Sequence, residues 1–172
     1  MKRFLVVALV VLAFYLPAQG RTSFRANPNG AARSSSRKVK SPAGDAEFKQ
    51  LLEQFLAAWS TLNADNAARF YARDADLIFF DIAPLEYHGW EEYRNGFKQV
   101  AEQFSSIKLT GNGDLKVTRR GNIAWTTETF HATGTQKNGQ AIDLNCRHTL
   151  IWERRGRRWL IVHEHVSVPM QS

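Results

Sequence analysis

Cysteine is nearly absent from this chain, with Cys146 the single one among 172 residues. One thiol cannot form an intrachain disulfide, so packing must hold the fold without covalent cross-links. The spacings HExxH and CxxC are also missing, which removes the usual sequence support for a metal site. No internal repeat is visible.

Acidic residues are absent before Asp45, although six cations lie between Arg21 and Gly44. This segment consists mainly of Ser, Pro, Gly, Asn and Ala, and it cannot bury enough surface to offset its ordering entropy. We therefore predict a disordered basic linker over residues 21–44. Its charge would attract acidic lipid or polyanions, but a solvated tail is the simpler interpretation.

The chain has no apolar run long enough to span a bilayer comfortably, because the longest extends only from Phe4 to Leu16. That run follows two cations and precedes small residues, which is the order of a secretory signal peptide. We predict a signal peptide over residues 1–20, cleaved after Gly20 or Ala18. The mature protein would then be secreted or periplasmic and would carry no stable membrane anchor.

The remaining segment, residues 45–172, lacks the positive charge that the whole chain suggests. The formal charge of the chain is +7, but this segment holds 15 basic and 16 acidic residues, a formal charge of −1. Nucleic-acid binding by the segment therefore has no electrostatic support, and we predict no nucleic-acid partner. Its 128 residues suffice for one domain with a single core.

Apolar residues first recur at helical spacing, at Phe48, Leu52, Phe55 and Trp59, and predict a helix from Asp45 to about Leu62. A short helix, a strand and a third helix are expected next, over residues 65–71, 77–82 and 89–104. Strand-like stretches separated by turn signals complete the domain, over residues 107–110, 115–118, 122–133, 142–153 and 159–167. Three helices before most of a sheet indicate an α+β fold.

The last two strands predict a hairpin whose register decides which side chains share a face. A two-residue loop at Arg155-Gly156 would pair Arg154 with Arg157. The four side chains that this register gathers on one face are Cys146, His148, His163 and His165. This cluster has the atoms for zinc or copper, but without a supporting motif we interpret the histidines as the lining of a polar cavity and predict no metal and no cofactor. We interpret RRGRR, residues 154–158, as a solvated hairpin tip.

Three stretches resemble the SnoaL-like members of the nuclear-transport-factor-2-like superfamily: FYARDADLIFFD, YHGWEEYRNGF and HTLIWERRGRRWLIVHEHVSVP. The last is also similar to the association domain of calcium/calmodulin-dependent protein kinase II, which has a W-x-R-R-x-x-x-W-L-x-V-H-x-H-x-S pattern. The resemblance covers nearly all of residues 45–169. It implies a cone-shaped fold, in which helices pack on a strongly curved, mostly antiparallel sheet that encloses a pocket. This superfamily hosts isomerases, dehydratases, cyclases, binders and oligomerisation modules, so the fold says little about chemistry.

The resemblance also implies which side chains face the pocket. Asp81 falls close to the general base of steroid isomerases of this superfamily. Their oxyanion-donating tyrosine appears here as Phe55, and their second acid as His148, so steroid isomerase activity is not expected. We take Asp81, His148 and His163 as candidate catalytic residues. The candidate ligand-binding residues are Trp59, His88, Trp125, Thr127 and His165.

Two functions remain open at this stage. In the first, the protein binds a small, partly apolar molecule and converts it, with Asp81 and a histidine as acid and base. In the second, the domain is an association module with a vestigial pocket. A hydrogen bond between Asp81 and His88, His148 or His163 would favour the first. Under either, we expect a homodimer through the outer face of the sheet, formed by Thr149, Ile151, Leu160, Val162 and Val166.

Overall fold

The computed structural model describes residues 43–170. The predicted signal peptide and nearly all of the predicted linker lie outside the described residues. Within residues 43–170, none of the helices combines the length and the hydropathy that crossing a membrane requires.

The helices lie where the apolar periodicity predicts them. Helix α1 (Ala43–Trp59) is followed by α2 (Ala64–Ala67), the 3-10 helix η1 (Ala68–Phe70) and α3 (Gly89–Ala101). Along α1 the buried residues recur three or four apart, which turns one face of the helix toward the sheet. At the start of α3, the Oε2 atom of Glu92 accepts a hydrogen bond of 2.7 Å from the backbone amide of His88, satisfying a donor at the helix N-terminus.

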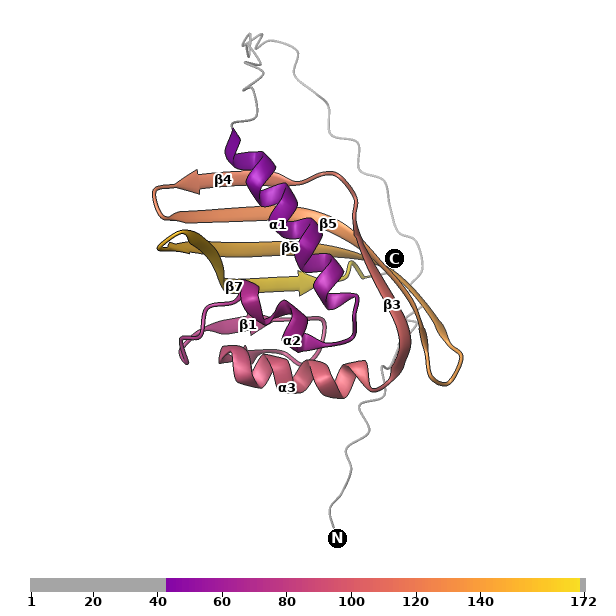
Figure 1. Cartoon of the computed structure of the whole chain (residues 1–172). Helices are drawn as coiled ribbons and strands as arrows, with labels where there is room; N and C mark the ends of the chain where they lie inside the picture. The colour runs from indigo at the N-terminus through magenta and orange to yellow at the C-terminus, as the bar shows by residue number, and fades with distance from the viewer. Residues whose placement is uncertain (1–42, 171–172) are drawn as a thin grey trace, which may run out of the picture. The chain divides into compact units, whose positions relative to one another are not determined.

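Seven strands form one mixed, mostly antiparallel sheet that curves around α1 (Figure 1). The strand order is β2-β1-β7-β6-β5-β3, and β4 pairs with β5 beside that path, so the sheet does not close into a barrel. Among the named strands of residues 43–170, β1 and β7 form the only parallel pair. The α+β prediction is therefore confirmed. The strands are β1 (Ile78–Phe80), β2 (Tyr87–His88), β3 (Phe104–Gly111), β4 (Lys116–Arg120), β5 (Ile123–Gln136), β6 (Ala141–Arg155) and β7 (Arg158–Ser167).

Strand β5 produces much of the curvature, because its two halves have different neighbours. Its first half pairs with β4 through Thr127 and its second half with β3 from Phe130 onward. In the second half, a Cβ atom on Gly134 would lie 2.4 Å from the backbone oxygen of Ser106. Glycine is required there because any side chain would separate the two strands.

The core fills the space between α1 and the concave face of the sheet. Aromatic rings dominate it, and Trp152 is fully buried in contact with Phe48 on α1. Trp59, at the end of α1, contacts Tyr93 and Phe97 of α3. The interior of the cone is thus largely packed with side chains, and polar groups enter it at only a few positions.

The predicted register of the last hairpin is wrong. The two-residue loop consists of Gly156 and Arg157, so Arg155 pairs with Arg158. Gly156 has φ of +63°, a conformation that suits glycine in such a turn. In addition, a β-bulge at Val162 shifts the register, with Trp152 opposite Ile161 but Ile151 opposite His163.

The bulge reverses the faces of strand β7 from His163 onward, because successive strand residues point to opposite sides and one residue has been inserted. Glu164 and Val166 point into the interior and are buried. His163 and His165 point to the outer face, opposite Ile151 and Thr149. The proposed cluster of Cys146 with three histidines is therefore not formed.

Candidate functional site

Three neighbouring strands bring a histidine and two carboxylates together in the interior. Glu128 on β5 lies directly opposite His148 on β6, and the bulge turns Glu164 on β7 inward beside them. The Nδ1 atom of His148 lies 3.3 Å from Oε1 of Glu128, and its Nε2 atom lies 3.0 Å from Oε1 of Glu164. The three side chains are 7% (Glu128), 1% (His148) and 3% (Glu164) exposed, so the cluster is shielded from solvent.

Aromatic side chains extend and cover this cluster. The hydroxyl of Tyr71 donates a hydrogen bond to Oε2 of Glu164, and it accepts one of 3.2 Å from the indole N–H of Trp59. Tyr71 follows η1, where the amide of Ala72 bonds to the carbonyl of Ile161 and fixes the chain beside β7. The ring of Phe55 stacks on His148 with 5.6 Å between centroids. Both oxygens of Glu164 are therefore engaged.

The carboxylates keep the imidazole charged. Burial lowers the pKa of His148, but the hydrogen bonds and charges of Glu128 and Glu164 outweigh it and raise that pKa to about 9. At neutral pH the cluster is an imidazolium between two carboxylates. Burial, together with the charge and hydrogen bond of Glu164, raises the pKa of Tyr71 well above its ordinary value, so Tyr71 remains a donor.

Asp81 lies at the end of β1, on the interior side and only partly buried. Its Oδ1 atom accepts a bond of 2.7 Å from the amide of Ile82, and its Oδ2 atom accepts one of 3.3 Å from the hydroxyl of Tyr93. Burial and then the charge of Glu164 raise the pKa of Asp81 to about 6, against the opposing effects of those two bonds and of His148. A carboxyl group with this pKa can take up and release a proton near neutral pH.

Asp81 is coupled to the buried cluster by charge and not by a direct bond. Within residues 43–170, its hydrogen-bond partners are Ile82 and Tyr93 and include no histidine. The direct bond to a histidine that would identify an acid–base pair is therefore not formed. Asp81 can exchange a proton with a ligand. The charge of Glu164 raises the pKa of Asp81, and the charge of His148 lowers it.

His163 and His165 do not reach the interior, contrary to the prediction. The Nδ1 atom of His163 lies 2.8 Å from the carbonyl oxygen of Ile78. Both imidazoles contact the ring of Phe80 on the outer face. The physical reason is the bulge at Val162, which the alternation of a regular strand does not anticipate.

Three further residues expected in the pocket lie elsewhere. Trp125 and Thr127 flank the buried Thr126 on β5, and alternation turns both to the outer face. His88 is exposed at the start of α3, 3.4 Å from a carboxylate oxygen of Glu86. Trp59 does lie inside, where it is 4% exposed.

Sequence reasoning missed Glu128, Glu164 and the tyrosines Tyr71 and Tyr93. Strict alternation along β7, with His163 and His165 inside, places Glu164 on the opposite face. Both glutamates have polar neighbours in the sequence, His163 and His165 for Glu164 and Thr127 and Thr129 for Glu128. Composition alone therefore carries no signal that either carboxylate is buried. The observed pairing places Glu128 directly opposite a histidine.

Metal ligands do not converge in the part of the chain that the structure describes: no three His, Cys, Asp or Glu side chains there could hold an ion together. Cys146 is 1% exposed and lies opposite Phe130. Burial, and to a smaller extent the charge of Asp81, raises the pKa of its thiol to about 11. The thiol is therefore protonated at neutral pH and unsuited to bind a metal or to attack a substrate.

A family model described as a SnoaL-like domain matches residues 48–171. Comparison with curated proteins gives no match. Among solved structures, the chain is similar to a nuclear transport factor 2-like superfamily protein from Salmonella enterica serovar Typhimurium. That similarity has a TM-score of 0.68 and 20% identity, and it covers 74% of this chain and 92% of the other.

Two further structures with a similar fold are described with different functions. A candidate calcium/calmodulin-dependent protein kinase II association domain from Xanthomonas campestris aligns with a TM-score of 0.63 and 25% identity, covering 73% of this chain and 88% of that one. A candidate dehydratase of the same fold family from Streptomyces avermitilis aligns with a TM-score of 0.65 and 15% identity, covering 76% and 100%. The resemblance stated from the sequence is thus confirmed, and the fold alone does not select a function.

Proposed function

The chain belongs to the SnoaL-like domain family, and from that premise we propose that it binds a small, partly apolar molecule and converts it by proton transfer at Asp81. The observation that carries the proposal is the partly buried carboxyl group of Asp81, with a pKa raised to about 6, beside a shielded carboxylate–imidazolium–carboxylate cluster. Perturbed carboxyl groups of this kind are concentrated at catalytic sites.

Asp81 acts as the general base. Its raised pKa makes the ionised carboxylate roughly a hundredfold more basic than an ordinary aspartate, since each pKa unit is a factor of ten. At pH 7 most of the group is nevertheless ionised and ready to accept a proton. Burial, with the charge of Asp81, raises the pKa of Tyr93 well above its ordinary value, so its hydroxyl stays a hydrogen-bond donor.

His148 is a positioning residue in this proposal. Its side chain is 1% exposed and hydrogen-bonds Glu128 and Glu164, so it acts on Asp81 through its charge. The net negative charge of the cluster favours the protonated form of Asp81, and the imidazolium limits that effect. His163 has no role in proton transfer, because it faces outward.

The surroundings of Asp81 suit a ligand with an apolar body. Ile82 is 42% and Leu85 is 86% exposed in the loop that follows Asp81. Exposed apolar side chains next to a titrating carboxyl group favour a molecule with few polar groups.

Native mass spectrometry of the protein from its source tests this proposal. We expect a retained small molecule, and we expect Asp81→Asn to bind it without converting it. Lys137→Ala, in the exposed turn between β5 and β6, serves as the control and should convert it normally. Conversion by Asp81→Asn at the rate of the unaltered protein would refute the role of Asp81.

The proposal includes a homodimer and export. Half-buried apolar side chains form a stripe on the outer face of the sheet, opposite the face that α1 covers, with Glu153 between Ile123 and Leu160. Val166 is removed from the predicted interface because it points inward. The residues of the outer stripe are Ile123, Trp125, Ile151 and Leu160.

For export, the mass of the mature protein should correspond to a start near Arg21.

A further inference from the structure

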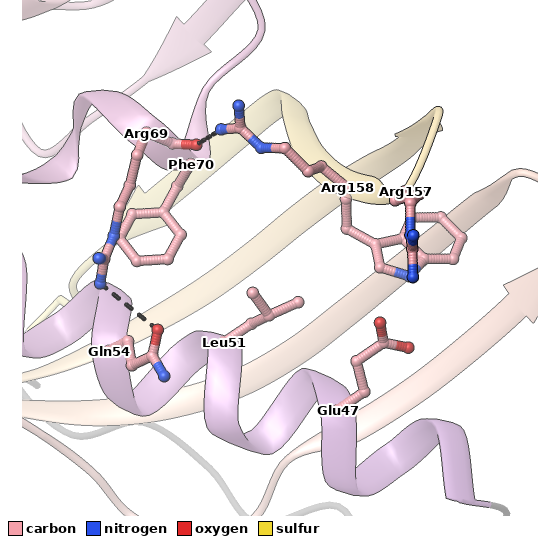
Figure 2. Close-up of a pocket in the computed structure, with 8 residues that line it drawn as sticks. Glu47, Leu51, Gln54, Arg69, Phe70, Arg157 and Arg158 are labelled. Atoms are coloured by element: carbon pink, nitrogen blue, oxygen red, sulfur yellow. Dashed lines mark hydrogen bonds between the residues drawn. The ribbon is translucent and has the colours of Figure 1, made fainter.

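A groove of about 470 Å³ opens between α1 and the tip of the β6–β7 hairpin (Figure 2). Its lining includes neither Asp81 nor the hydrogen-bond partners of Asp81, Ile82 and Tyr93, nor any of His148, Glu128 and Glu164. Its volume lies within the range of sites for small molecules. The proposed function does not use this groove.

The lining of the groove is strongly basic. Arg69, Arg157 and Arg158 contribute three guanidinium groups, and Glu47 contributes the one carboxylate of the lining. Within residues 43–170, none of the three arginines forms a salt bridge. The lining therefore carries a formal charge of +2.

Two of the guanidinium groups are already held in place. Arg158 donates a hydrogen bond of 2.5 Å from Nη2 to the backbone oxygen of Arg69. The side chain of Arg69 bonds to Oε1 of Gln54 at 3.4 Å and lies over the ring of Phe70 at 4.7 Å. Each guanidinium has five N–H donors, so most remain available. Because these side chains are ordered beforehand, binding loses less of their entropy.

Apolar groups lie beside the arginines. Leu51, Phe70 and Trp159 line the same groove. Arg119 lies over the ring of Trp159, 4.9 Å from its centroid, and adds positive charge nearby. The groove thus combines apolar side chains with a cationic rim, and Figure 2 shows Arg157 and Arg158 on the hairpin side of the groove.

We propose that this groove binds a phosphate monoester with a compact apolar body. A phosphate monoester carries a charge between about −1.5 and −2 at neutral pH, which matches the formal charge of the lining. The planar guanidinium groups bind phosphate oxygens through paired N–H donors. The apolar body lies against Leu51, because Phe70 and Trp159 are only 3% and 5% exposed.

Calorimetric titration of the full chain with phenyl phosphate tests the proposal. We expect saturable binding that weakens at least tenfold in Arg157→Gln and in Arg158→Gln. Because Arg157 has no partner in the described residues, its substitution leaves the fold intact even if that of Arg158 disturbs the carbonyl of Arg69. Arg120→Gln is the matched control, since Arg120 is an exposed arginine over the Trp125 ring on the outer face, and it should bind as the unaltered chain does.

The probes separate the parts of the proposal. Benzoate, a monoanion, and inorganic phosphate, without an apolar body, should each bind at least tenfold more weakly than phenyl phosphate. Asp81→Asn should bind phenyl phosphate normally, so the groove and the proposed catalytic function can fail separately. Absent binding, equal affinity for the three probes, or an equal loss in Arg120→Gln would overturn the proposal.

Discussion

The Nε2 atom of His148 lies 3.0 Å from Oε1 of Glu164, and this contact spans strands β6 and β7 in the interior of the sheet. It exists because the bulge at Val162 turns Glu164 inward. This contact, together with the one to Glu128, keeps the imidazole of His148 protonated inside the core. The pKa of Asp81 depends on the charges of both side chains, since Glu164 raises it and His148 lowers it.

Stability should fall as the pH rises through the titration of His148. Its pKa is about 9 in the folded protein and about 6.5 in an unfolded chain, so the folded state holds the proton more tightly. The resulting stabilisation is complete below pH 6.5 and is lost between pH 6.5 and 9. Its size is roughly 3 kcal/mol by linkage. Urea unfolding at about pH 6 and pH 9.5 measures it.

His148→Gln is the control for that experiment, because its amide keeps N–H donors in the cluster but does not titrate. It should be less stable at pH 6 and should lose much less stability toward pH 9.5, where the raised pKa of Cys146 still contributes a smaller loss. If the variant loses as much stability between the two pH values as the unaltered protein does, the titrating group is another one.

The number of residues between Ile161 and Glu164 should decide which way β7 faces. Deleting Val162 alone removes the unpaired residue, so His163 follows Ile161 directly and Glu164 still points inward. Deleting Val162 and His163 together turns Glu164 outward and His165 inward. We expect the double deletion to cost about 4 kcal/mol or more, because a buried network is broken and a polar ring is buried without partners. Similar stabilities for the single and the double deletion, measured by chemical denaturation, would contradict this account.

The sequence predicted the elements much better than the orientation of side chains. Periodicity located α1 and the long strands because burial repeats along them, as at Phe48, Leu52 and Phe55. It could not locate the bulge, since one inserted residue changes no composition and leaves an apolar run apolar. His148 was placed inside because β6 is regular, whereas His163 and His165 were misplaced because they follow the bulge.

The outer face should mediate dimerisation. Ile151→Asp places a charge in the apolar stripe of β5, β6 and β7 and should convert a dimer to monomers, which sedimentation velocity would detect. Leu85→Asp is the control, because Leu85 is 86% exposed in the loop after β1 and lies outside the stripe. An unchanged dimer in Ile151→Asp would place the interface elsewhere.

The most direct test of the central claim is the titration of the Asp81 carboxyl carbon, followed by ¹³C NMR in the unaltered protein and in Glu164→Gln. The account predicts a midpoint near pH 6 in the unaltered protein, because burial and the charge of Glu164 raise the pKa. In Glu164→Gln the midpoint should fall, since that charge is gone while the hydrogen bond from Tyr93 remains. A midpoint near 3.8 in the unaltered protein, or one that Glu164→Gln leaves unchanged, would contradict the claim that the buried cluster prepares Asp81 for proton transfer.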